Sequence, residues 1–81
     1  MDLFIVRICL LPLRNPLTID NLRIYLTYDE AYTYISKFCT EKKISINKKP
    51  FDKNNRSYVY EDLLEEQFIW IEKHNLISKV I

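Results

Sequence analysis

Glycine is absent from this 81-residue sequence, and alanine and proline are scarce, with one and three copies. Glycine supplies the positive-φ turns and the close backbone approaches that phosphate-binding loops require. Its absence excludes Walker, Rossmann and glycine-rich kinase loops. The chain is therefore not a nucleotide-binding enzyme of any of these classes.

Export signals and clustered metal ligands are missing as well. The most apolar run, Leu3–Leu11, is interrupted by Arg7, is too short to span a bilayer, and lacks the basic start and cleavage site of a signal peptide. Cys9, Cys39 and His74 are isolated in sequence, without C-x-x-C or H-x-x-x-H spacing. We therefore expect a cytoplasmic protein with reduced thiols, no metal, no other cofactor and no membrane contact.

The overall composition is that of a folded chain. Hydrophobic residues make up 48%, aromatic residues 14% and charged residues 28%, with a net charge of +1. A disordered chain has fewer apolar residues and a larger net charge. A chain of this length buries only about 60–65% of the surface its unfolded form exposes. We expect one domain over residues 1–81 with a thin core.

The first part of the chain predicts two strands. Leu3–Leu11 is a run of branched and large apolar residues, typical of a central strand that is apolar on both faces. A loop between Pro12 and Pro16 follows, since proline removes a ladder donor. Leu22–Thr27 alternates as a half-buried strand does. Its expected buried face carries Leu22, Ile24 and Leu26.

A helix over about residues 28–42 is the clearest local prediction. Thr27 and Glu30 form a T-x-x-E capping box at its start. Apolar residues then recur every three or four positions, which gives one stripe along the helix. The stripe consists of Ala31, Tyr34, Ile35, Phe38 and Cys39.

A hairpin is predicted next, with its turn at Asn54-Asn55. Asparagine tolerates the left-handed region, and alternating segments lie on either side of the pair, around 44–46 and 58–60. This register would place Phe51 opposite Tyr58, a favourable aromatic pair.

The last segment is open to two interpretations. Acidic residues cluster at 61–66, and Leu64, Phe68 and Ile71 have helical spacing, which favours a second helix over about 62–74. Against this, Phe68-Ile69-Trp70-Ile71 suits a final strand. Leu76–Ile81 would follow as a short strand or a docked tail. The expected fold is α+β, with a mostly antiparallel sheet of about four strands.

Charge is strongly polarised along the chain. Seven cations and two acids lie between positions 37 and 56, whereas five acids and no cation lie between 61 and 72. A basic hairpin around Phe51 could follow phosphates while its ring stacks on bases. In the alternative interpretation, these lysines only keep the exposed edge of the hairpin soluble. The candidate basic patch comprises Lys42, Lys43, Lys48, Lys49, Lys53 and Arg56, together with Phe51.

Aromatic residues suggest a contact surface for proteins. Tyr25, Tyr28 and Tyr32 fall outside the apolar faces assigned above, and Trp70 is the one tryptophan. Exposed aromatic residues are enriched in protein interfaces. These four are the candidate partner-binding residues, for a protein partner or for a homodimer or larger assembly.

No nucleophile constellation is present, so we expect no enzyme. The leading hypothesis is a non-enzymatic interaction protein. The alternative is a nucleic-acid-binding module that uses the Lys42–Arg56 hairpin, and a distant third is an acid/base hydrolase around His74 and the carboxylates near it. Ile, Lys, Asn and Tyr, whose codons are AT-rich, fill 31 positions. In composition and size the chain resembles small accessory proteins of AT-rich viruses and phages.

Overall fold

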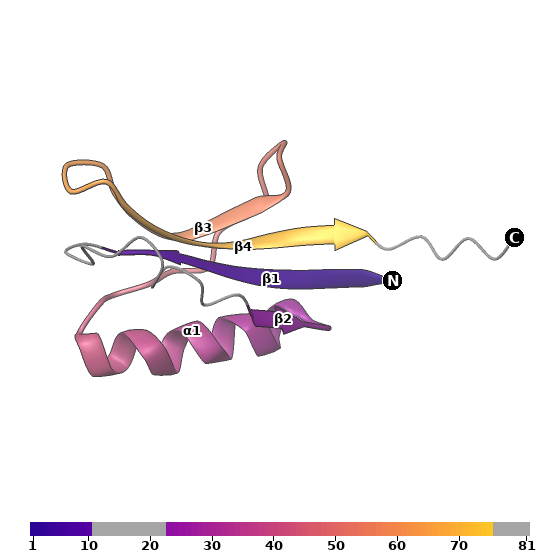
Figure 1. The fold of residues 1–81 in the computed structure, drawn as a ribbon, viewed down its shortest axis with the longest axis horizontal. Helices are drawn as coiled ribbons and strands as arrows, with labels where there is room; N and C mark the ends of the chain where they lie inside the picture. Colours follow the sequence, from indigo (N-terminus) through magenta and orange to yellow (C-terminus); the bar gives the residue numbers. More distant parts are fainter. Residues whose placement is uncertain (11–22, 76–81) are drawn as a thin grey trace, which may run out of the picture.

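The computed structural model describes residues 1–10 and 23–75. These ranges contain one helix and four strands, which form a single antiparallel sheet in the order β2-β1-β4-β3 (Figure 1). The small α+β fold is therefore confirmed. The elements are β1 (Asp2–Cys9), β2 (Arg23–Tyr25), α1 (Tyr28–Lys42), β3 (Arg56–Asp62) and β4 (Gln67–Asn75). The predicted Pro12–Pro16 loop and the Leu76–Ile81 tail lie outside the described residues.

The central position predicted for the first strand is confirmed. β1 pairs with β2 on one side and along its own whole length with β4 on the other, from Asp2 opposite Asn75 to Cys9 opposite Phe68. α1 lies against one face of the sheet (Figure 1). The core is formed between this helix and the sheet. Its buried apolar residues are Val6, Ile8, Leu10, Ala31, Ile35, Cys39, Val59, Ile69 and Ile71.

The predicted helix forms over its expected range. The Thr27 hydroxyl accepts a hydrogen bond from the Glu30 N–H at 3.1 Å, which satisfies one of the free amides at the helix start. The helix ends at Lys42 and is capped by Lys43, which adopts a left-handed conformation with φ 57° and donates its N–H to the carbonyls of Cys39 and Thr40. Ala31 and Ile35 point into the core, as the apolar stripe predicts.

The second helix predicted over 62–74 is wrong. β3 continues to Asp62, a turn covers residues 63–66, and β4 occupies most of the segment. Of the acids that suggested a helix start, Glu61 and Asp62 end β3 and Glu65 and Glu66 lie in the turn, where the Asp62 carboxylate accepts the Glu65 N–H at 3.2 Å. Ile69 and Ile71 are fully buried beneath α1, and strand alternation sends Trp70 to the opposite face. Burial on both sides of β4 therefore outweighs the helical spacing.

The predicted hairpin is only partly correct. A turn does form, because the Asp52 carboxylate accepts the N–H groups of Asn54 and Arg56, and Asn55 has φ 59°. Residues 44–50 form no strand, however. β3 pairs with β4 instead, and Phe51 packs against the rings of Phe4 and Tyr28 rather than Tyr58.

The face assigned to β2 is also wrong. Tyr25 and Arg23 point toward the helix, where the Tyr25 ring lies 6.0 Å from Tyr34 and the Arg23 guanidinium lies 5.1 Å from the same ring. Ile24 therefore faces the other side and is 54% exposed, and Leu26 is 63% exposed. The third residue of the predicted buried face, Leu22, lies outside the described residues.

Candidate functional site

The face of the sheet that turns away from α1 is the candidate site, and we call it the open face. Side chains alternate between the two faces of a strand, so the register assigns every second residue to this surface. The one helix of the described residues, α1, lies on the other side of the sheet (Figure 1). The open face consists of Leu3, Ile5, Arg7, Cys9, Ile24, Arg56, Tyr58, Glu61, Phe68, Trp70, Glu72 and His74.

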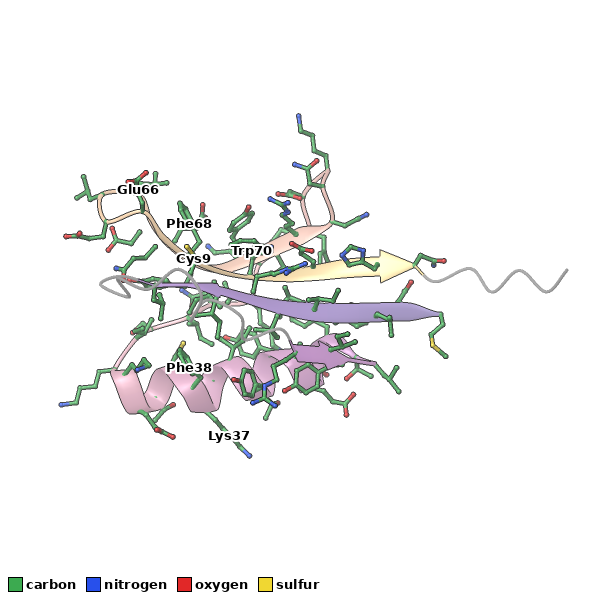
Figure 2. All side chains as sticks on the ribbon, in the orientation of Figure 1. Cys9, Lys37, Phe38, Glu66, Phe68 and Trp70 are labelled. Atoms are coloured by element: carbon green, nitrogen blue, oxygen red, sulfur yellow. The ribbon has the colours of Figure 1, made fainter. Side chains whose placement is uncertain are left out.

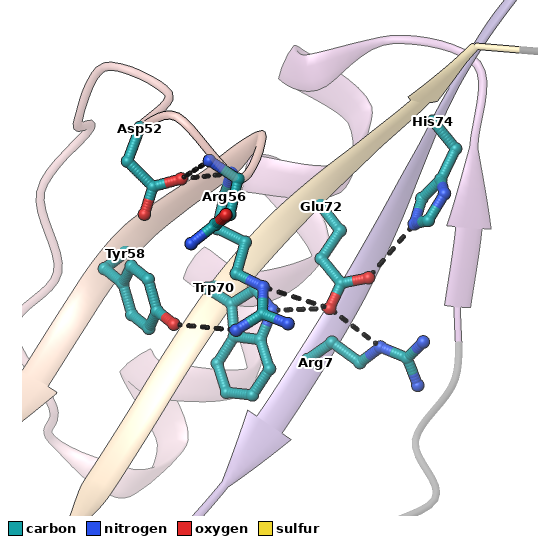
Figure 3. Close-up of polar contacts among 8 residues, drawn as sticks. Arg7, Asp52, Arg56, Tyr58, Trp70, Glu72 and His74 are labelled. Atoms are coloured by element: carbon teal, nitrogen blue, oxygen red, sulfur yellow. Dashed lines mark hydrogen bonds and ion pairs between the residues drawn. The ribbon is translucent and has the colours of Figure 1, made fainter.

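Glu72 is the central polar residue of the open face (Figure 3). Its side chain is only 12% exposed. One carboxylate oxygen, Oε2, accepts the indole N–H of Trp70 at 2.8 Å and lies 3.4 Å from Arg7 Nε and 3.8 Å from Arg56 Nε. The other, Oε1, lies 3.1 Å from His74 Nε2. Three strands therefore contribute partners to one carboxylate.

This environment keeps Glu72 ionised. Burial alone raises the pKa of a carboxyl group, because the charged form loses its hydration. Hydrogen bonds from His74 and Trp70, and then the charges of Arg7 and Arg56, outweigh that burial and bring the pKa of Glu72 below its usual value. The site is thus a stable ion cluster rather than a carboxyl group prepared to exchange protons near neutral pH.

Aromatic rings adjoin this cluster. Tyr58 lies 5.4 Å from Trp70 and 6.2 Å from Phe68, measured between ring centroids. The Arg56 guanidinium is 5.4 Å from the Trp70 ring, and its Nη1 donates to the Tyr58 hydroxyl at 3.3 Å. Phe68 and Trp70 lie on the side of the sheet away from α1 (Figure 2). The result is a fixed patch of aromatic and arginine side chains.

Only one of the four predicted partner-binding residues, Trp70, belongs to the open face. Tyr25, Tyr28 and Tyr32 lie on the helix side, half-buried against the core. The Tyr28 hydroxyl shares a hydrogen bond of 3.0 Å with the buried Ser57, and its ring stacks on that of Tyr32 at 6.1 Å. These tyrosines contribute to packing, contrary to the expectation that they are exposed.

The predicted basic patch is divided in space. Lys42 and Lys43 lie at the end of α1, whereas Lys48 pairs with Asp29 in its first turn at 3.5 Å. Arg56 belongs to the open face. Of the others, Lys49 and Lys53 lie in the exposed segment before β3, and Phe51 is half-buried against the core. Cations that are close in sequence therefore do not form one continuous surface.

The cysteines, the histidine and the acidic residues were the other candidates for a metal or catalytic site. Within residues 1–10 and 23–75, no group of three His, Cys, Asp or Glu side chains could hold a metal ion. Cys9 and Cys39 are free thiols, the first on the open face and the second buried on the helix side. Nothing helical in these ranges is long and apolar enough to cross a membrane. His74 contacts a carboxylate that three other side chains already engage.

Comparisons with protein-family models, curated proteins and solved structures found no match for this chain.

Sequence reasoning missed most of the open face, including Arg7, Tyr58 and Glu72. A usable signal was nevertheless present in residues 68–74, where the aromatic residues Phe68 and Trp70 alternate with Ile69 and Ile71. Taken as a strand, this segment places Phe68, Trp70, Glu72 and His74 on one face. The helical spacing of the same segment concealed that pattern.

Proposed function

We propose that this chain is a non-enzymatic interaction protein that binds a protein partner, foreign or its own copy, through the open face. The observation that carries the proposal is the aromatic patch of Tyr58, Phe68 and Trp70, held in place by the Glu72 ion cluster. Tryptophan, tyrosine and arginine are the residue types that dominate binding energy in protein interfaces. Side chains that are already fixed lose little conformational freedom on binding.

Nucleic acid is the second candidate, and one observation favours it. Bases stack on aromatic rings and on arginine planes, and Arg56 lies over Trp70 on the open face of a four-stranded sheet. The charge of this face argues against it. Arg7 and Arg56 are balanced there by Glu61 and Glu72, whereas a nucleic-acid surface normally has a clear basic excess.

The test uses two matched lysine substitutions. Ile24→Lys places a charge on the open face at a position that is already 54% exposed. Thr33→Lys places the same charge on the exposed outer side of α1. Immobilised wild type and both variants are incubated with lysate from the producing cells, and each protein retained is then purified and its affinity is measured directly.

We expect to recover from the lysate a protein that binds wild type and Thr33→Lys equally well. It should bind Ile24→Lys at least about tenfold more weakly, a difference of about 1.4 kcal/mol in binding free energy. Equal binding to all three would contradict a role for the open face. Retention of oligonucleotides, with an affinity that falls steeply with salt, would favour the second candidate.

A further inference from the structure

We infer that the turn between β3 and β4 is a second docking surface, which inserts two leucines into an apolar pocket with a basic rim on a foreign protein. The turn covers residues 63–66 and lies at the end of the sheet away from the N-terminus (Figure 1). Leu63 is 75% exposed and Leu64 is 96% exposed. This turn is separate from the aromatic patch of the open face, and the inference does not depend on the proposed function.

The conformation of the turn does not require leucine. The Asp62 carboxylate accepts the Glu65 N–H at 3.2 Å, and Glu66 adopts the left-handed conformation with φ 54°. A turn needs such side-chain hydrogen bonds to the backbone and residues that tolerate this conformation. Leu63 and Leu64 belong neither to the buried core nor to the apolar residues packed against it. Their exposed side chains therefore contribute little to the stability of the fold.

The turn at the other end of β3 provides a comparison. It consists of four polar residues, Asp52–Asn55, and is closed by a hydrogen bond of 2.9 Å from the Asn55 N–H to the Asp52 carbonyl. One turn of this chain thus has the usual polar composition, whereas the other exposes two adjacent leucines. Exposed apolar residues that occur singly are common, but an apolar patch rimmed by polar residues is typical of an interaction site.

Acidic residues surround the leucine pair. Glu61 and Asp62 precede it, Glu65 and Glu66 follow it, and no cation occurs between positions 61 and 72. None of these four carboxylates forms an ion pair with a residue that the structure describes, whereas Glu72 pairs with two arginines. A cationic partner can therefore supply charge interactions that the described part of the chain does not.

The leucines and the acids together define the kind of partner. Two leucine side chains lose contact with water only in an apolar pocket, and the acids beside them favour lysine or arginine at its rim. A nucleic acid would be repelled, because its surface carries phosphates. An anionic membrane would be repelled by its own negative surface potential. A protein with an apolar pocket in a basic surface fits both features.

The first measurement tests whether the leucines serve the fold. The double variant Leu63→Asn/Leu64→Asn should unfold at the same urea concentration as wild type or at a higher one, because asparagine is a common turn residue. A clearly lower midpoint would assign the leucines to folding and would overturn the inference.

Binding is measured with the same double variant and with Leu26→Asn, which removes a leucine that is 63% exposed elsewhere. A protein retained by immobilised wild type from lysate of the producing cells is purified, and its rate constants are measured directly. We expect equal binding to wild type and Leu26→Asn, and dissociation at least about tenfold faster from the double variant. Glu65→Lys/Glu66→Lys should slow association at least about tenfold at low salt, since charges at the rim of an interface steer the encounter.

The absence of any protein that requires the leucines would overturn the inference. Leucine-dependent binding to phosphatidylserine vesicles, or leucine-dependent self-association, would overturn it as well. A partner that requires the leucines but not Ile24 would support this inference alone. A partner that requires Ile24 but not the leucines would overturn this inference and leave the proposed function standing.

Discussion

On the helix side of β4, Ile69 and Ile71 are fully buried by packing alone, whereas on the open face their neighbours Trp70 and Glu72 are held by hydrogen bonds and charges. The same strand therefore supports two kinds of surface. The helix side is a closed apolar core whose stability comes from removing surface from water. The open face is a partly exposed surface whose central side chains are held by hydrogen bonds and ion pairs within the chain.

This difference affects how well each face tolerates substitution. The core residues could be exchanged for others of similar volume at modest cost. The ion cluster on the open face is less tolerant, because removing one member leaves charged neighbours near a partly buried site. Both faces therefore contribute to stability, the helix side through burial and the open face through the ion cluster.

The largest expected effect is on the helix side. Ile71→Ala should lower the free energy of unfolding by about 2–5 kcal/mol, because it removes buried methylene groups and leaves a cavity. The matched substitution Ile24→Ala removes the same atoms from a position that is half exposed, and we expect a loss below about 1 kcal/mol in the monomer. Urea denaturation monitored by circular dichroism measures both. Equal losses would mean that the two faces are similarly buried.

An intermediate effect is expected at the centre of the open face. Glu72→Gln keeps an oxygen that can accept the Trp70 indole N–H, but it no longer balances Arg7 and Arg56. We expect a loss of about 1–3 kcal/mol in the free energy of unfolding, the range for disrupting a partly buried hydrogen-bonded charge. The same denaturation experiment at neutral pH measures it. An unchanged midpoint would show that the cluster does not stabilise the fold.

The pH dependence of this difference has a defined sign. The pKa of Glu72 is lower in the folded chain than in the unfolded chain, so the unfolded state takes up the proton first as pH falls. The stabilisation is fully present above the unfolded value, near pH 4.3, and is lost as pH falls through the folded value. The advantage of wild type over Glu72→Gln should therefore shrink below about pH 4. A constant difference down to pH 2 would contradict this.

The two faces could be predicted from the sequence only where the residues that form them interact with near neighbours in the chain. α1 was predictable because its capping residue Thr27 and its apolar stripe are local. β1 was predictable because a run of apolar residues on both faces is typical of a central strand. β4 was not predictable, because the apolar residues of its segment match both helical spacing and strand alternation. Only the pairing with β1, which is distant in sequence, favours the strand.

The open face could not be assembled from sequence for the same reason. Arg7, Arg56 and Glu72 come together only through the order β1-β4-β3, and no local pattern encodes that order. The orientation of β2 likewise depends on contacts outside the strand, because the Tyr34 ring of α1 contacts Tyr25 and Arg23. Local alternation defines two faces of a strand, but the tertiary partner determines which face is buried.

The smallest expected effect is a kinetic one, and it compares the two faces through their cysteines. Cys39 is buried on the helix side, and burial raises the pKa of its thiol, with Lys42 partly opposing that shift. The thiolate is the reactive form, so Cys39 should react with a maleimide only when the structure opens locally. Cys9 is half-buried on the open face and needs no such opening.

We expect Cys9 to react at least about tenfold faster than Cys39 in dilute native protein, which corresponds to a difference of about 1.4 kcal/mol in barrier. Peptide mass spectrometry after timed quenching measures both rates, and the denatured protein, in which both thiols should react alike, is the control. If Cys39 reacted as fast as Cys9, the helix side would be no better protected than the open face, and the distinction between a closed core and a partly exposed face would be wrong.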